Sequence, residues 1–275
     1  MRFVRTLSAM INTNTERAYW EQRLGSNVPL NAVGYRGLSN AFVAWSYRVK
    51  ARRFQKYAAQ LVTTNSRILD VGSGGGFAID NWQRLGMRDI TGSDFTDASV
   101  SALNGRFPGV SCVRMDISEQ ELPFAEGSFD AISCIDVLYH IVDDDRYAAA
   151  FRNFGRLLKP GGHLIFTENF LHAGTMRGAQ LHGVFRSLGV IQSLARDAGL
   201  KLKSRRPLFV LMNIPMDSSN PLLRFYWKAM NRLMKNPVLG YVAGALLYPV
   251  ELLATSLLRE GPSTEIAVAQ KIEAP

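Results

Sequence analysis

The chain has 275 residues, of which 47% are apolar and 20% are charged. This length can bury a full core, and the composition excludes a collagen-like, low-complexity or intrinsically disordered chain. The net charge is +9, and residues 1–60 alone carry +8, with ten Lys and Arg against Glu16 and Glu21. Such a basic segment could bind nucleic acid, an anionic membrane surface or an acidic substrate. The alternative is that it binds no partner and is simply a helix face exposed to solvent.

Aromatic residues lie among the charges of the first sixty residues, and glycine and proline interrupt their middle. We therefore expect residues 1–62 to form a helical cap and residues 63–275 the main domain. Charged residues follow the start too closely for the apolar core of a signal peptide. The only two cysteines, Cys112 and Cys134, fall in apolar stretches typical of buried thiols, so we expect a reducing, cytoplasmic location.

From residue 67 onward, short apolar runs alternate with stretches of helical pattern. The runs expected to be strands are 68–71, 90–94, 110–115, 129–135, 163–167, 208–212 and 266–272. Strands separated by helices predict βαβ units, and hence an α/β fold with a seven-stranded, mostly parallel sheet and helices on both faces. The turn 159–162 should lead into the fifth strand, and residues 184–199 predict an amphipathic helix.

Glycine-rich residues 70–76 (DVGSGGG) follow the first expected strand, where an α/β sheet binds its ligand and bare backbone allows close approach. A loop for nucleotide triphosphates requires Lys and then Ser or Thr after the last glycine, but Phe77 and Ala78 stand there. A dinucleotide fingerprint requires its third glycine where Phe77 stands, whereas this chain has Gly76. The loop is therefore D-x-G-x-G-x-G, with Asp70 as its acid.

Acidic residues also end the next two expected strands. Asp94 ends the second, where a carboxylate can accept both hydroxyls of a ribose, and a helix N-cap is the alternative. Asp116 ends the third, where a turn-capping role is the alternative to ligand binding.

Taken in order, the loop 70–76, Asp94 and the segments 113–117 (VRMDI), 129–140 (FDAISCIDVLYH) and 157–164 (LLKPGGHL) resemble the class I S-adenosylmethionine (SAM) dependent methyltransferases, most closely their small-molecule branch. The resemblance covers residues 66–212 and implies a Rossmann-like fold with SAM as cofactor. It also implies that the loop holds the methionine part of SAM, while Asp94 takes the ribose and Asp116 the adenine amino group. The implied cofactor-binding residues are Asp70, Gly72, Ser73, Gly74, Gly76, Asp94, Phe95, Met115, Asp116, Ile117, Ile135 and Tyr139.

The implied activity is methyl transfer to an oxygen or nitrogen of a small, apolar or glycan-like acceptor. His140 follows the fourth strand and is the candidate general base, and a structural histidine bonded to a backbone carbonyl is the alternative. Three further alternatives are a methyltransferase of a lipid-linked acceptor at the membrane surface, a protein that uses SAM only as a bound cation for a lyase or cyclisation step, and a non-enzymatic binding protein.

Neither a metal site nor a nucleic acid acceptor is expected. The remaining histidines, His163, His172 and His182, show no metal-ligand spacing, and the acids at 143–145 fit the start of a helix. Enzymes that methylate the amines of nucleic acid bases carry an Asn/Asp-Pro-Pro-Tyr/Phe motif, which residues 135–138 lack.

An apolar insertion is expected at residues 215–262, before the last strand. Residues 238–258 contain Glu251 as their only charge and approach the length of a membrane-spanning helix. Pro249, Glu251 and the return of the chain to the sheet argue against a span. We expect a helical lid over the acceptor pocket or a homodimer face, and peripheral contact with the inner face of a membrane is the alternative.

Overall fold

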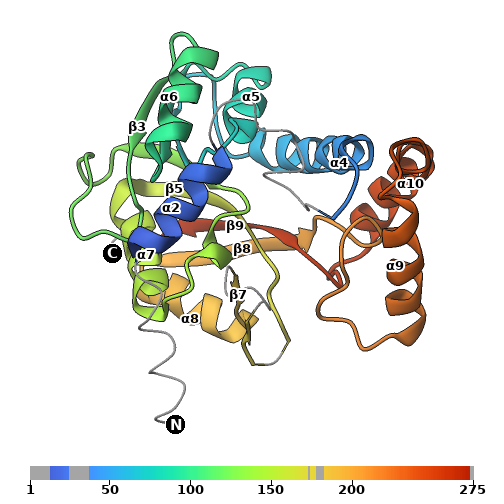
Figure 1. The fold of residues 1–275 in the computed structure, drawn as a ribbon. Coiled ribbons are helices and arrows are strands. Elements are labelled where there is room, and N and C mark those ends of the chain that lie inside the picture. Colours follow the sequence, from blue (N-terminus) through green and yellow to red (C-terminus); the bar gives the residue numbers. More distant parts are fainter. Residues whose placement is uncertain (1–12, 25–36, 173, 178–182, 273–275) are drawn as a thin grey trace.

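The computed structural model describes residues 13–24, 37–172, 174–177 and 183–272 (Figure 1). Seven strands form one sheet in the order β3-β2-β1-β4-β5-β9-β8. Their bounds are β1 Arg67–Val71, β2 Asp89–Asp94, β3 Ser111–Arg114, β4 Phe129–Cys134, β5 Leu158–Glu168, β8 Leu200–Pro207 and β9 Glu265–Lys271. The first five strands pair in parallel, and β9 runs antiparallel to both of its neighbours. The expected α/β class and mostly parallel sheet are therefore confirmed.

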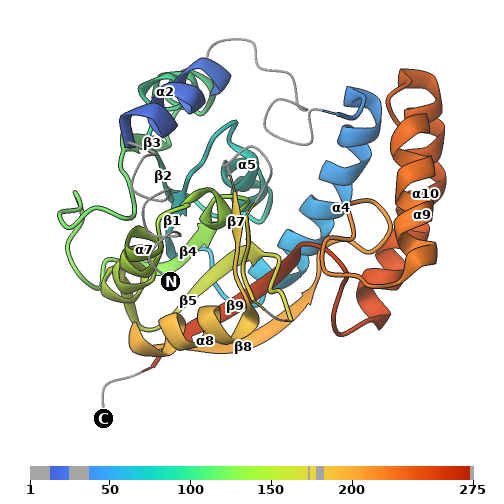
Figure 2. The ribbon, with the colours of Figure 1, turned by 60° about the horizontal axis from the view of Figure 1, so that its bottom comes forward.

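Helices cover both faces of this sheet (Figure 2). Their bounds are α2 Thr13–Leu24, α4 Asn40–Ala58, α5 Phe77–Arg84, α6 Asp97–Arg106, α7 Asp144–Leu157, α8 Leu188–Asp197, α9 Pro221–Leu233 and α10 Pro237–Leu257. A short 3-10 helix, η1 (Leu138–His140), follows β4, and β6 (Met176–Arg177) pairs with β7 (Val184–Phe185).

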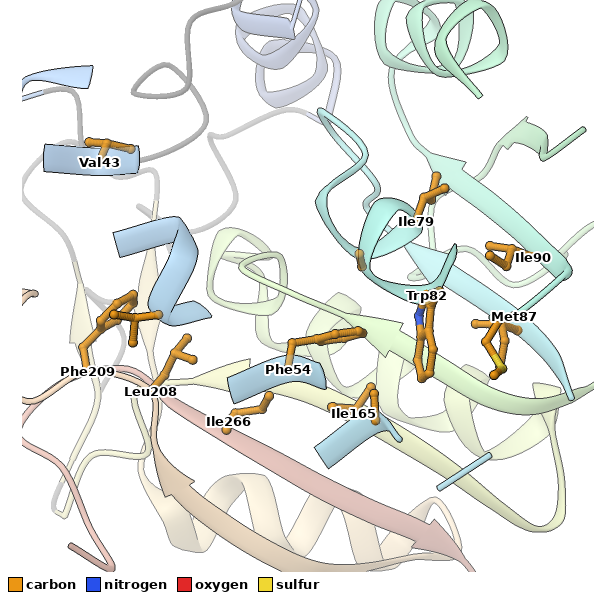
Figure 3. Packing of buried hydrophobic residues seen from close by; sticks show 14 of the residues in the cluster. Val43, Phe54, Ile79, Trp82, Met87, Ile90, Ile165, Leu208, Phe209 and Ile266 are labelled. Carbon is orange, nitrogen blue, oxygen red and sulfur yellow. The ribbon is translucent and has the colours of Figure 1, made fainter. Parts of the chain in front are cut away.

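Alternate strand residues supply the two cores, because successive side chains of a strand point to opposite faces. Ile68 of β1 packs with α4, α5 and α6, whereas its neighbour Leu69 packs with α7 and α8. In the first core the rings of Phe54 and Trp82 meet edge to face, 5.0 Å apart, above Ile165 (Figure 3). The continuous apolar runs of the parallel strands thus reflect burial on both faces.

The strand predicted at 208–212 was wrong, and the helix predicted at 184–199 is present with different bounds. The sixth strand is β8 and not 208–212; its charged, alternating sequence lies at the edge of the sheet, where charged side chains are typical. Residues 208–212 are apolar because Leu208, Phe209 and Met212 are buried. The helix expected at 184–199 begins only at Leu188, after the β7 strand and the capping residue Ser187.

The turn predicted at 159–162 lies inside β5 as an irregularity. Pairing with β4 shifts between Phe129 and Ala131, and Gly161 has a left-handed φ of 75°. The fifth strand therefore begins five residues earlier than the expected bound of 163.

The insertion lies between β8 and β9 in the chain, as expected, but it packs against α4 at the edge of the molecule (Figure 2). Gly240 and Gly244 of α10 allow this approach, because an added Cβ would lie 2.3 Å from Ser39 Oγ and 2.4 Å from Trp45 Cδ1, respectively. The expected boundary at residue 62 remains a prediction, and residues 1–12 and 25–36 of the expected cap lie outside the described residues.

Candidate cofactor and acceptor site

A cavity of about 570 Å³ opens at the carboxyl ends of the parallel strands. One wall is formed by the glycine loop and the residues that end β1 to β4, and the other by α2 and α4. Most of the expected cofactor-binding residues line it, namely Asp70, Gly72, Ser73, Gly74, Asp94, Phe95, Met115, Asp116, Ile117 and Ile135. Gly76 and Tyr139 are not among its lining residues, and no described residue of the insertion is.

The glycine loop needs glycine for its conformation and for its contacts. Gly72, Gly74 and Gly76 have φ values of 67°, 50° and 82°, in the left-handed region that side chains disfavour. A Cβ on Gly72 would lie 2.3 Å from a methyl group of Val137, and one on Gly76 would lie 2.3 Å from the Phe107 ring. Gly76, the N-cap of α5, therefore allows close packing against the end of α6, whereas Gly72 and Gly74 present bare backbone to the cavity.

Asp94 holds the glycine loop against the second strand. Its Oδ2 accepts a hydrogen bond from the Gly74 amide (2.9 Å), and its Oδ1 accepts from the amide and hydroxyl of Thr96 (3.0 and 2.7 Å). The N-cap of α6 is Thr96, so the alternative N-cap role for Asp94 was wrong. Burial raises the pKa of Asp94 despite these hydrogen bonds.

Asp70 lies fully buried at the end of β1. Its Oδ1 accepts a hydrogen bond from the Ser133 hydroxyl (2.6 Å), while its buried Oδ2 has no hydrogen-bond partner among the described residues. Burial raises the pKa of Asp70 to about 7, and the Ser133 hydrogen bond opposes this rise. An orphaned carboxylate oxygen beside the loop favours a cationic or hydrogen-bond-donating ligand.

Asp116 lies between Met115 and Ile117, both buried in the cavity wall. Its Oδ1 accepts hydrogen bonds from the amide and hydroxyl of Ser118 (2.9 and 2.6 Å), so the turn-capping alternative is present in the structure. Its Oδ2 pairs with Arg146 at 2.6 Å.

Helix α2, part of the expected cap, lines the cavity, but none of its residues was predicted individually as part of the site. Glu16 pairs with Arg146 at 3.0 Å, and the Trp20 ring lies 4.7 Å from the His140 ring. Glu21 accepts hydrogen bonds from the amides of Asp97 and Ala98 at the start of α6 (2.8 and 3.0 Å). These partners are some 75 to 130 residues away in sequence, so no local pattern could indicate them.

An ion pair formed by the buried Lys50 of α4 was also missed. Lys50 pairs with Asp136, which follows β4 with a left-handed φ of 60° and is held by the Thr167 hydroxyl at 3.1 Å. Burial alone would lower the pKa of Lys50, but the adjacent Asp136 outweighs it and the pKa is raised. The Lys50 ammonium also lies 4.4 Å from the centre of the Tyr47 ring, whose pKa burial raises. A strand-end residue in a left-handed conformation carries no signal in a single sequence.

Of the histidines that the structure describes, His140 alone lines the cavity. Its neighbour Tyr139 turns away and packs 5.5 Å from the Phe185 ring. His172 pairs with Asp217 and Glu260 on the surface, and His182 lies outside the described residues. Among the residues whose structure is described, no group of three or more His, Cys, Asp or Glu could hold a metal ion.

The acids expected to start a helix do so. Asp143 is the N-cap of α7 and accepts a hydrogen bond from the Arg146 amide at 2.9 Å. Asp144 and Asp145 occupy its first turn, and Asp144 pairs with the buried Arg186. Negative charges there favour the helix dipole.

Comparisons with known proteins agree with this geometry. A family model described as a methyltransferase domain matches residues 69–166. The ubiquinone biosynthesis O-methyltransferase of Alkalilimnicola ehrlichii is 38% identical over 104 residues, 37% of this chain and 40% of that protein. An enzyme of the same name from Acinetobacter baylyi is 28% identical over 191 residues, 60% of this chain and 72% of that protein. The matches span only 40% and 48% of the first two curated relatives.

Solved structures show the same fold at low sequence identity. The N-methyltransferase NodS from Bradyrhizobium japonicum, in complex with S-adenosylhomocysteine, has a TM-score of 0.52 at 16% identity over 94% of this chain and 99% of that one. The [4+2]-cyclase SpnF has a TM-score of 0.53 at 21% identity over 81% of each chain. Residues 69–166 therefore form a methyltransferase domain of the class I SAM-dependent type.

Proposed function

We propose that this protein transfers a methyl group from SAM to an oxygen or nitrogen of a small acceptor bound beneath α2 and α4. The observation that carries the proposal is a cavity in which the strand-end wall offers bare loop backbone and carboxylates, while the helical wall adds the rings of Trp20 and Tyr47 among apolar and charged side chains. Its volume of about 570 Å³ lies within the range of small-molecule sites, roughly 300–1,000 Å³.

The strand-end wall suits SAM residue by residue. Gly72, Ser73 and Gly74 would bind the methionine part, with the start of α5 beside its carboxylate. Asp94 would accept hydrogen bonds from the ribose and Asp116 from the adenine amino group. A cationic sulfonium would be favoured by the unpaired carboxylate oxygen of Asp70 in this wall, whereas the charge of Asp136 is already balanced by Lys50. The roles of Gly76 and Tyr139 would then be indirect, through α5 and through His140.

The helical wall suits the acceptor. Trp20, Tyr47 and the stem of Lys50 offer apolar and aromatic surface, which would exclude water and orient a flat or apolar molecule. When bound, SAM would supply an electrophilic methyl group. The acceptor oxygen or nitrogen would attack that carbon in line, and S-adenosylhomocysteine would be the leaving group. We propose His140 as the base that takes the acceptor proton, so that the products are the methylated acceptor and S-adenosylhomocysteine.

The curated relatives are named O-methyltransferases, which favours oxygen over nitrogen as the atom methylated. A cytoplasmic location agrees with this reaction. A second subunit or a membrane would contact another face of the molecule, which takes no part in the proposed methyl transfer.

Two measurements test the proposal. Calorimetry should show that the protein binds SAM and S-adenosylhomocysteine, and a folded protein that binds neither would refute it. Release of S-adenosylhomocysteine should then be measured with a panel of phenols, sugars and amines, expecting turnover with a phenolic or other hydroxyl acceptor. Conversion of a panel compound without that release would instead assign a lyase or cyclase role.

A further inference from the structure

The outer faces of α9 and α10 carry most of the exposed large apolar side chains of the described residues. On α10 they recur every three or four positions along the whole helix: Val238, Val242, Leu246, Val250, Leu253 and Leu257. Leu246, Leu253 and Leu257 are 69%, 61% and 73% exposed. Twenty-one helical residues give this stripe a length of about 30 Å. So long an apolar stripe is rare on a monomer that faces only water.

The opposite face of α10 is fixed to the rest of the molecule. Gly240 and Gly244 contact α4, and the buried carboxylate of Glu251 accepts hydrogen bonds from the amides of Val210 and Leu211 (2.6 and 2.9 Å). The helix is long and apolar enough by composition to cross a membrane, and 22% of its most apolar window is buried. Crossing would draw Glu251 into hydrocarbon and abandon these contacts, so α10 can meet a bilayer only with its outer face.

Helix α9 lies beside α10 at this edge (Figure 1), and α9 and the turn after it carry a row of cations. Arg224, Lys228, Arg232 and Lys235 recur at three- or four-residue spacing, and all four are exposed. They alternate with a second exposed row that includes Leu222, Phe225 and Leu233. Between residues 221 and 258 the only acid is Glu251, which is buried and hydrogen-bonded to the amides of Val210 and Leu211, so α9 and α10 present no exposed acid to pair with those cations.

We infer that the surface formed by the outer faces of α9 and α10, residues 221–258, docks on an anionic lipid bilayer. The apolar rows enter the boundary between headgroups and acyl chains, and the α9 cations contact anionic headgroups. A second copy of the chain fits less well, because a two-fold interface through this edge would bring four cations against four cations without an acid between them. The inference does not depend on the proposed methyl transfer.

Flotation with lipid vesicles tests the docking surface. Phosphatidylcholine vesicles with and without phosphatidylglycerol are mixed with the full-length protein at low and high salt. We expect flotation with the anionic vesicles at low salt, weakening as salt screens the cations, and little with phosphatidylcholine alone.

Two double variants separate the two components. Lys228→Gln with Arg232→Gln should lower partition onto anionic vesicles about 30-fold, since each cation at such a surface contributes about fivefold. Leu246→Ser with Leu253→Ser should lower it at least tenfold, through roughly 25 cal/mol per Å² of lost apolar contact. Matched controls are Arg196→Gln with Lys201→Gln, and Val190→Ser on α8, all exposed and elsewhere.

All variants change exposed side chains, and their thermal transitions and SAM affinities should match the wild type. A wild-type protein that remains unbound with anionic vesicles at low salt would refute the docking surface, as would α9 and α10 variants that float like the controls. A dimer in sedimentation that only the Leu246 and Leu253 variant dissociates, without vesicle binding, would assign the face to a second subunit instead.

Discussion

The two walls of the cavity are built in different ways. The strand-end wall comes from residues 70–75, 94 and 115–117, each placed by the strand that it ends or follows. The helical wall depends on Glu16, Trp20 and Lys50, whose partners Arg146, His140 and Asp136 are distant in sequence. Local chain geometry therefore fixes the cofactor side, whereas tertiary packing fixes the acceptor side.

The largest effect is expected from Gly72→Val, which tests whether local chain geometry fixes the cofactor side of the cavity. The new side chain would overlap Val137 and force a left-handed residue to carry a branched Cβ, so SAM affinity should fall by at least a thousandfold, about 4 kcal/mol. Gly109→Val is the matched control, since Gly109 also has a positive φ but an added Cβ would meet nothing within 4 Å. The SAM affinities of both folded variants are measured by calorimetry. Equal affinities would mean that the loop does not approach the cofactor.

The second test concerns Glu168, an acid at a strand end that does not line the cavity. Glu168 ends β5, but it is fully buried with the Tyr147 hydroxyl donating to it at 2.9 Å, and burial raises its pKa from 4.5 to about 7. The folded protein then holds this proton more tightly than the unfolded chain, so stability falls as pH rises from 4.5 to about 7.

Glu168→Gln removes that titration. Relative to the wild type, the variant should gain about 3 kcal/mol of unfolding free energy between pH 4.5 and pH 7, while Asp70 titrates equally in both proteins. Urea unfolding at several pH values measures the gain. A difference that does not change with pH would show that Glu168 is ionised in the folded protein throughout.

Asp94→Ala has the next largest expected effect, because it removes both the support of the Gly74 amide and the proposed ribose contact. SAM binding should weaken by roughly 1.5–3 kcal/mol, the scale of hydrogen bonds to a charged group. A 2′,3′-dideoxy analogue of SAM separates the two roles. If the variant loses as much affinity for the analogue as for SAM, Asp94 acts only by holding the loop.

The sequence was most informative where a strand runs straight into its functional residue. The D-x-G-x-G-x-G pattern and the acids Asp94 and Asp116 could be placed because a parallel sheet brings its strand ends to one edge. The same logic failed for 208–212, where Leu208 and Phe209 are buried without strand pairing, since apolar runs report burial and not hydrogen bonding. It could not find Lys50, whose environment depends on where α4 packs.

The smallest effect should come from the helical wall itself. Trp20→Ala removes the edge-to-face contact with His140, worth about 0.5–1.5 kcal/mol for aromatic pairs, and opens the mouth of the cavity. If α2 forms the acceptor side, the KM for a hydroxyl acceptor should rise about three- to tenfold while SAM affinity changes less than twofold. Gln22→Ala, exposed on the same helix, is the control. An equal loss of SAM affinity would place Trp20 on the cofactor side and remove the distinction between the two walls.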